Sequence, residues 1–297
     1  MPPEVSSLQA VHQLPEAISD RHVVLTSADG TSLFYRHWPA EDWNGRIAIV
    51  LHGIGYHSGP YKVIADALNP AGTDVYGLDA RGHGLSHGAR GFVGTPAQIQ
   101  ADVSALVQLA RRERPGARIF LIGDSMGADM ALSYAKHHGA DLSGLVLLAL
   151  ALNLHLSQFL GLESARLFPN LLFARRKPVI NLVGWRLDVS SRDADFVARR
   201  RADPLAYKNV SFGYLLDIQR LVWNWRWAIA PKIKTPLLMI KGGADTVVSH
   251  GECLSFHRRS AATDKRLEIL PNVPHTTLWD PQSQEILKSV GDWVLDR

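Results

Sequence analysis

Ser125 lies at the centre of the pentapeptide GDSMG, residues 123–127. The stretch before it, 119–122, is apolar, as in a buried strand, and residues 126–138 have the period of a helix. Glycines in this spacing permit a tight strand-to-helix turn that holds the serine hydroxyl out at the end of the strand, a geometry called a nucleophile elbow. The pentapeptide also occurs by chance, so its weight depends on whether the chain supplies partners for a serine nucleophile.

A serine hydroxyl becomes an effective nucleophile when a histidine accepts its proton and a carboxylate orients that histidine. Asp245 follows the apolar stretch 237–240, and His275 lies just past the next one, 266–270. Both are therefore expected in loops at strand ends, in the chain order Ser, Asp, His. Among the other histidines that follow the serine, His155, His250 and His257 do not lie just past a strand. We predict Asp245 as the acid and His275 as the base.

Acyl transfer also needs two backbone N–H donors for the oxyanion, one after the nucleophile and one from the loop after an early strand. Met126 directly follows the serine. The apolar stretch 47–51 ends in the tetrapeptide HGIG, residues 52–55, whose glycines leave the backbone of Ile54 open to a substrate. Taken alone, this tetrapeptide is equally compatible with an ordinary tight turn. We expect the N–H groups of Ile54 and Met126 to form the oxyanion hole.

The elements that must position these residues alternate along the chain. Short apolar runs bounded by Gly, Pro or Asp predict strands, and segments of helical period lie between them. The strands are expected at 23–26, 32–37, 47–51, 74–78, 119–122, 145–150, 236–240 and 266–270. The helices are expected at 61–68, 96–114, 126–138, 249–259 and 281–296. The later strands are apolar on both faces, which predicts βαβ units around a buried parallel sheet.

Residues 153–231 interrupt this alternation, because they contain no convincing strand and are rich in Leu, Phe and Trp. We predict an inserted, mostly helical subdomain here, which we call the cap segment. The core is then formed by residues 21–152 and 232–297, and residues 1–20 form an N-terminal arm.

Two features of the cap segment concern ligands. The apolar stretch 159–173 runs into the basic residues 175–177, and would line an acyl channel, contact an anionic membrane surface transiently, or form the core of the cap itself. Trp223, Trp225 and Trp227 alternate near the end of the segment. On one helix this spacing points side chains to different faces, so we expect at most two of them to line a pocket.

The composition is that of an ordinary globular protein, with 297 residues, 46% hydrophobic and 20% charged. The 32 Lys and Arg against 28 Asp and Glu form no dense basic stripe, so we expect no nucleic-acid partner. A single cysteine, Cys253, excludes an internal disulfide. The start lacks the pattern of a signal peptide, and the longest apolar run, 144–152, is too short to span a membrane, so we expect a cytoplasmic protein. Without metal-ligand spacing or a phosphate-binding loop, we expect no metal or other cofactor.

The chain resembles the serine hydrolases of the α/β-hydrolase superfamily, in particular the branch of monoacylglycerol lipases and lysophospholipases. The matching stretches are LHGIGYHSGPY (51–61), LDARGHGLSHG (78–88), GDSMGA (123–128), SRDADFVARRRADPL (191–205) and the loops of Asp245 and His275. The resemblance covers about residues 22–295. It implies a mostly parallel, eight-stranded sheet flanked by helices, with the cap segment over Ser125, and a triad of Ser125, Asp245 and His275. It also implies a structural role for His83 and Ser86.

Three positions depart from the monoacylglycerol lipase pattern. The chain has Tyr56, Pro60 and Asp124 where that pattern has Glu, Arg and His near the glycerol head group. We therefore expect Tyr56 and Asp124 to contact a different head group. For Asp124 the alternative is a side chain that points away and bonds to a nearby backbone group or arginine.

The residues together predict a cofactor-independent hydrolase of carboxylic esters with a hydrophobic acyl group. A thioesterase, an amidase or an acyltransferase would use the same triad, so these activities stay open. A ligand-binding protein without catalysis is a more distant alternative. The expected partner is a small ester or lipid, and the sequence predicts no oligomeric state.

Overall fold

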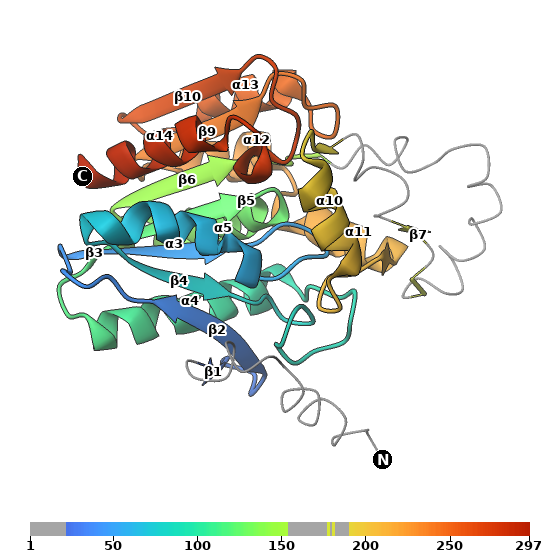
Figure 1. Cartoon of the computed structure of the whole chain (residues 1–297), viewed down its shortest axis with the longest axis horizontal. Coiled ribbons are helices and arrows are strands. Elements are labelled where there is room, and N and C mark those ends of the chain that lie inside the picture. Colours follow the sequence, from blue (N-terminus) through green and yellow to red (C-terminus); the bar gives the residue numbers. More distant parts are fainter. Residues whose placement is uncertain (1–21, 154–176, 179, 182–189) are drawn as a thin grey trace.

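The computed structural model describes residues 22–153, 177–178, 180–181 and 190–297 (Figure 1). The predicted arm, 1–20, lies outside the described residues, as does the apolar stretch 159–173.

An eight-stranded sheet forms the centre of the molecule. Its order is β1 (His22–Thr26), β2 (Ser32–Trp38), β4 (Asp74–Leu78), β3 (Arg46–Leu51), β5 (Arg118–Asp124), β6 (Gly144–Leu148), β9 (Leu237–Gly242) and β10 (Lys265–Leu270). β2 pairs antiparallel with β1 and β4, and the other neighbours are parallel. The predicted strand positions and the mostly parallel α/β-hydrolase sheet are confirmed.

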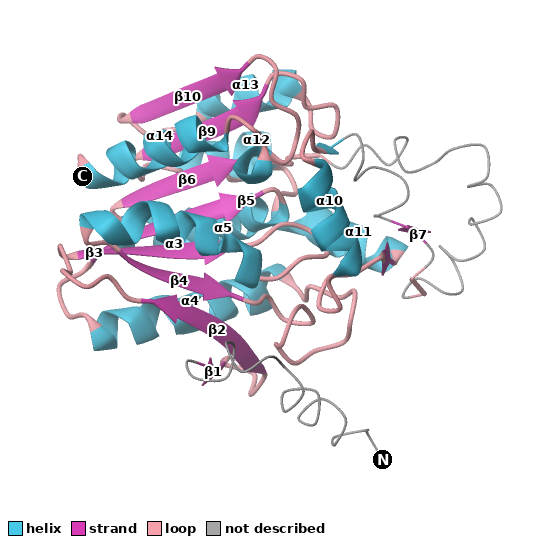
Figure 2. Ribbon diagram, in the orientation of Figure 1, coloured by secondary structure: helices cyan, strands magenta, loops and turns pink. Residues whose placement is uncertain are grey.

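Helices cover both faces of this sheet (Figure 2). The side chains of Ile47, Ile49 and Leu51 pack with α4 (Pro96–Glu113), α5 (Met126–His138) and α13 (His250–Arg259). The alternate residues, Ala48 and Val50, pack with α3 (Lys62–Leu68) and α14 (Ser283–Leu295). Short 3-10 turns complete the core: η1 (Gly59–Tyr61), η2 (Asn69–Ala71), η3 (Gly139–Asp141), η5 (Ala230–Lys232) and η6 (Thr277–Trp279). Because both faces of β3 are covered, this strand is apolar along its whole length.

The described part of the cap segment contains three helices, α10 (Ala194–Ala202), α11 (Phe212–Leu221) and α12 (Trp225–Ala228). Figure 1 shows α10 and α11 beyond the arrowheads of the central strands. The segment also contains a small antiparallel pair that the sequence did not predict: β7 (Ile180–Asn181) pairs with β8 (Asn209–Val210). Strands of two residues are too short to produce the alternating pattern by which a strand is predicted. None of the described helices is long and apolar enough to cross a bilayer.

Candidate active site

Ser125 occupies a strained turn between β5 and α5. Its backbone φ is 51° and ψ is −115°, outside the regions that most L-residues adopt. A Cβ on Gly123 would lie 2.3 Å from the carbonyl oxygen of Gly127, and a Cβ on Gly127 would lie 2.0 Å from that of Leu51. Both glycines are therefore required by close backbone packing, and the serine is left at the carboxyl end of the central strand.

Ser125, His275 and Asp245 come together from three separate strand ends. His275 Nε2 lies 3.1 Å from Ser125 Oγ, and His275 Nδ1 lies 2.9 Å from Asp245 Oδ2. The carboxylate can only accept, so Nδ1 carries the proton and Nε2 is free to accept the proton of the serine hydroxyl. This is the relative arrangement of a nucleophile, its base and the acid that orients the base.

The charges around Asp245 keep it ionised. Its Oδ1 accepts hydrogen bonds from the backbone N–H groups of Val247 and Val248 at 2.7 and 3.2 Å. Lys241 Nζ lies 3.2 Å from Oδ2. Burial alone would raise the pKa of Asp245, but His275, Lys241 and these N–H groups outweigh it and hold the pKa below its ordinary value.

The pKa of His275 shifts in the opposite direction. Burial lowers the pKa of His275, but the carboxylates of Asp245 and Asp124 outweigh burial and raise that pKa above its ordinary value, while Lys241 opposes them. Sequence reasoning missed Lys241, whose side chain is only 1% exposed. Its one signal was a charged residue at the end of an otherwise apolar strand, β9.

The N-terminus of α5 packs against the loop that follows β3, residues 52–55, which we call the oxyanion loop after the role predicted for it. Because Gly127 contacts the Leu51 carbonyl so closely, the first residue of α5, Met126, is held beside this loop. Gly55 has a φ of 65°, which a residue with a side chain adopts at a cost. The structure thus brings the backbones of Ile54 and Met126 to the same end of the sheet as Ser125.

Asp124 is buried and points at Tyr61. The Tyr61 hydroxyl donates to Asp124 Oδ2 at 2.6 Å and accepts from the backbone N–H of Gly53 at 2.8 Å. Burial raises the pKa of Asp124, and the Tyr61 hydrogen bond opposes that rise. This geometry matches the interpretation in which Asp124 bonds inside the protein, although its partner is a tyrosine and not a backbone group or an arginine.

Tyr56 packs in an aromatic cluster and is only 4% exposed. Its ring lies edge-on to those of Tyr61, Phe196 and Trp279, with centroids 5.8 to 6.2 Å apart. Burial raises the pKa of Tyr56 to about 12. Pro60, another departure from the lipase pattern, lies beside this cluster in η1.

His83 and Ser86 are both engaged in structural hydrogen bonds. His83 Nε2 lies 2.6 Å from the Tyr214 hydroxyl, and burial lowers the pKa of His83 to about 3, so the ring stays neutral. Ser86 Oγ donates to the carbonyl oxygen of Asp79 and accepts from the backbone N–H of Phe34.

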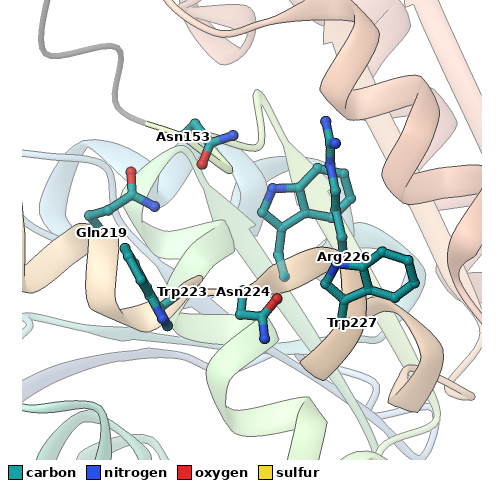
Figure 3. A pocket seen from close by; sticks show the side chains of 7 residues that line it. Asn153, Gln219, Trp223, Asn224, Arg226 and Trp227 are labelled. Atoms are coloured by element: carbon teal, nitrogen blue, oxygen red, sulfur yellow. The ribbon is translucent and has the colours of Figure 1, made fainter.

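A separate surface pocket of about 760 Å³ lies between Asn153, the end of α11 and α12 (Figure 3). Its lining residues are Asn153, Gln219, Trp223, Asn224, Trp225, Arg226 and Trp227. The expectation that at most two tryptophans line a pocket was wrong, because all three do. Asn224, with a left-handed φ of 58°, interrupts the chain between Trp223 and α12, so the spacing rule for one helix does not apply.

No group of three or more His, Cys, Asp or Glu side chains within the described ranges could hold a metal ion.

The chain is similar to known proteins in both sequence and structure. The family model described as serine aminopeptidase, S33 (Hydrolase_4), matches residues 44–282. The monoacylglycerol lipase of Mycolicibacterium smegmatis is 26% identical over 270 residues, which are 90% of this chain and 94% of that protein. The human monoglyceride lipase is 28% identical over 285 residues, 92% of this chain and 90% of that protein. The crystal structure of the Paleococcus ferrophilus monoacylglycerol lipase superposes with a TM-score of 0.76 at 23% identity, over 89% of this chain and 98% of that one.

Proposed function

The chain belongs to the hydrolase family described as serine aminopeptidase, S33, in the monoglyceride lipase branch of the α/β-hydrolases, and we propose that it cleaves esters of hydrophobic acyl groups through Ser125, His275 and Asp245. The observation that carries the proposal is the continuous contact from Ser125 Oγ through the His275 ring to Asp245, with distances of 3.1 and 2.9 Å. The chain is an ester-hydrolysing serine hydrolase. The proposal concerns the three catalytic residues and the acyl-enzyme mechanism.

In the acylation step, His275 Nε2 takes the proton of Ser125 Oγ while that oxygen attacks the ester carbonyl carbon. The negative charge moves to the carbonyl oxygen, where the N–H groups of Ile54 and Met126 donate hydrogen bonds. The bond to the alcohol oxygen then breaks, and His275 gives its proton to the departing alkoxide. Asp245 stabilises the imidazolium that exists between the two proton transfers.

Water completes the cycle. His275 takes a proton from water, whose oxygen attacks the acyl-enzyme carbonyl carbon, and the same two N–H groups bind the second oxyanion. The bond to Ser125 Oγ breaks, the serine recovers its proton from His275, and the carboxylic acid leaves. The N-terminus of α5 directs its positive end at both oxyanions.

The head group is proposed to differ from glycerol. Tyr56 and Asp124 stand where the lipase pattern has polar residues of another kind. Both are buried, and Asp124 bonds Tyr61, so they would act on the head group indirectly, Asp124 through its charge beside Ser125. If these positions set head-group selectivity, Asp124→His should shift the relative rates toward glycerol esters. Unchanged relative rates across head groups in this variant would contradict the head-group proposal.

The cap segment, residues 153–231, is proposed to cover the site and to touch a membrane surface transiently. Support comes from Trp223 and Trp227, which are 73% and 70% exposed, and from the exposed Arg226 between them. Exposed tryptophan beside arginine suits the boundary between acyl chains and anionic head groups. Trp223→Ala with Trp227→Ala should reduce sedimentation with phosphatidylserine-containing vesicles, whereas Val24→Ala, an exposed residue on β1, should not. Equal sedimentation of both variants with wild type would exclude this surface.

One substrate panel tests the main proposal. A single acyl chain is presented as monoacylglycerol, alkyl ester, thioester and amide, and kcat/KM is measured for each, with Ser125→Ala as the control. We expect an ester to lead by tenfold or more, which corresponds to about 1.4 kcal/mol in the transition state. A leading thioester or amide would replace the proposed activity with that one. No turnover together with no fluorophosphonate labelling of Ser125 would overturn the proposal.

A further inference from the structure

Arg200, on α10 of the cap segment, contacts the oxyanion loop directly. Its Nη2 donates to the carbonyl oxygen of Ile54 at 2.7 Å, across 146 residues of sequence. Its Cζ lies 4.8 Å above the centre of the Tyr56 ring. These two contacts place a guanidinium from the cap on the residues that follow β3. The proposed acyl-transfer steps assign no role to this arginine.

The peptide that carries the Ile54 N–H is anchored by the core on one side. Its carbonyl, on Gly53, lies 2.9 Å from His52 Nδ1. His52 Nε2 accepts from the backbone N–H of Ala80 at 3.0 Å, so Nδ1 carries the proton and donates to Gly53. Burial lowers the pKa of His52 to about 4, which keeps the ring in this neutral form. The Tyr61 hydroxyl anchors the preceding peptide by accepting from the Gly53 N–H.

The next peptide, between Ile54 and Gly55, is anchored by the cap segment. Arg200 donates to the carbonyl oxygen of this peptide, on Ile54, and the N–H of the peptide, on Gly55, donates to the Tyr214 hydroxyl at 3.4 Å. The Gly55 carbonyl then accepts from the backbone N–H of Tyr207 at 2.7 Å. Of these cap contacts, the Arg200 bond is charge-assisted and short, so it is the strongest single anchor on this side.

Such anchors matter because glycines flank Ile54. Gly53 and Gly55 turn easily about their backbone bonds, so the Ile54 N–H would lose its direction without fixed neighbours. A donor that is oriented before the reaction stabilises an oxyanion far better than one that must reorient. We propose that Arg200 is a positioning residue through which the cap segment holds the Ile54 N–H in its catalytic orientation. This inference rests on the proposed function, because it assigns an orientation to one of its two oxyanion donors.

Substitution of Arg200, with its neighbour as control, tests the inference. Arg200→Met keeps the aliphatic stem and removes the donors, and Arg200→Lys keeps the charge and one donor group. Arg199→Met is the matched control, because Arg199 is 64% exposed and its ion-pair partner, Asp193, lies outside the oxyanion loop. The assay is hydrolysis of a soluble short-chain ester, well below the melting temperature of each variant.

We expect Arg200→Met to lower kcat about 10- to 100-fold with KM changed less than about threefold, since removal of a whole oxyanion donor typically costs about 10²- to 10³-fold. Affinity for a trifluoromethyl ketone, which forms a tetrahedral adduct with serine, should fall in parallel with kcat/KM. Arg200→Lys should recover part of the loss, and Arg199→Met should stay within about twofold of wild type.

Several outcomes would overturn the inference. In an active wild-type enzyme, a wild-type kcat in Arg200→Met, or a lower Tm with unchanged kcat, would leave Arg200 only a structural role. If Arg200→Met does not fold, Arg200→Lys decides: a folded Lys variant with wild-type kcat and ketone affinity would reject the need for a guanidinium. If the wild-type protein itself neither hydrolyses the substrate panel nor reacts with a fluorophosphonate, the proposed function fails first and removes the basis of this inference.

Discussion

Tyr61 joins Asp124, the residue before Ser125, to the oxyanion loop: its hydroxyl donates to the Asp124 carboxylate at 2.6 Å and accepts from the backbone N–H of Gly53 at 2.8 Å. The single buried hydroxyl therefore satisfies a buried acceptor and a buried donor at once. Asp124 ends β5 and Gly53 follows β3, so the tyrosine connects the ends of the two strands that lead to Ser125 and to the predicted oxyanion donor.

Tyr61→Phe should lower both stability and turnover. The variant leaves the Asp124 carboxylate and the Gly53 N–H without this partner, which costs about 1–3 kcal/mol for a buried group. Denaturant unfolding measures the first effect and kcat on a soluble ester measures the second. Tyr76→Phe is the control, because its hydroxyl bonds Glu113 outside the site, so it should lose stability without losing kcat. Equal kcat in both variants would contradict a role for Tyr61 in the site.

Asp245→Asn should leave the fold intact and lower kcat about 10⁴-fold, because an amide no longer holds the His275 proton on Nδ1 or stabilises the imidazolium. Single-turnover kinetics with a chromogenic ester measure the change. Asp264→Asn removes an exposed carboxylate that pairs with Arg297 and should be nearly neutral. A loss of less than about tenfold in Asp245→Asn would argue that another acid orients the histidine.

Activity should rise with pH through a pKa above 6.5, because His275, whose pKa is raised, is the proposed base and must be neutral to accept a proton. Asp124 contributes to that rise, so Asp124→Asn should move the acidic limb of the kcat/KM profile to lower pH. An unshifted limb would show that the Asp124 charge does not reach the imidazole.

Lys241→Met should move the same limb in the opposite direction. The Lys241 charge lowers the pKa of His275, so its removal should shift the acidic limb to higher pH. Lys241 also donates to the Val248 carbonyl at 3.1 Å. The substitution leaves that buried carbonyl without this hydrogen bond, so the variant should be less stable than wild type. The opposite signs in Asp124→Asn and Lys241→Met make the pair a sharper test than either alone; shifts of the same sign would reject the assignment of the limb to His275.

Linkage gives the histidine and its acid opposite effects on stability. His275, with its raised pKa, contributes stability that is present below its unfolded pKa and lost as pH rises through its folded pKa. Asp245, with its lowered pKa, contributes stability that is present above its unfolded pKa and lost as pH falls through its folded pKa. The free energy of unfolding, measured against pH, should therefore fall below that of wild type at low pH in His275→Ala and at high pH in Asp245→Asn.

The strands and the residues at their ends could be predicted because each depends on local sequence. A buried parallel strand is apolar throughout, and the glycines around Ser125 reflect backbone packing within a few residues. The partners of the site could not be predicted in this way. Tyr61, Arg200 and Lys241 reach Asp124, Ile54 and Asp245 through the folded arrangement, and an arginine within the exposed-looking run Arg199 to Arg201 gives no sign of which member turns inward. The tryptophan pocket was misjudged for the same reason, since one left-handed residue, Asn224, changes the geometry.

Asp129→Asn should stabilise the protein at neutral pH. Asp129 lies one turn after Ser125 on α5, is fully buried, and neither carboxylate oxygen has a hydrogen-bond partner among the described residues. Burial raises its pKa well above the ordinary value; the backbone N–H of Ala151 opposes that rise, although it does not meet the geometry of a hydrogen bond to either oxygen. The folded state therefore holds a proton that the unfolded chain releases above about pH 4, and stability falls as pH rises from there toward the folded pKa.

An amide cannot ionise, so Asp129→Asn removes this pH-dependent cost, and its advantage over wild type should grow between pH 4 and 7 to about 1–3 kcal/mol. Asp102→Asn is the matched contrast: Asp102 is equally buried but bonds Arg81 at 2.6 and 2.7 Å, so its loss should destabilise by about 3–5 kcal/mol. Urea unfolding of both variants across this pH range measures the difference. An Asp129→Asn variant less stable than wild type at pH 7 would mean that the carboxyl group has a partner in solution and is ionised there.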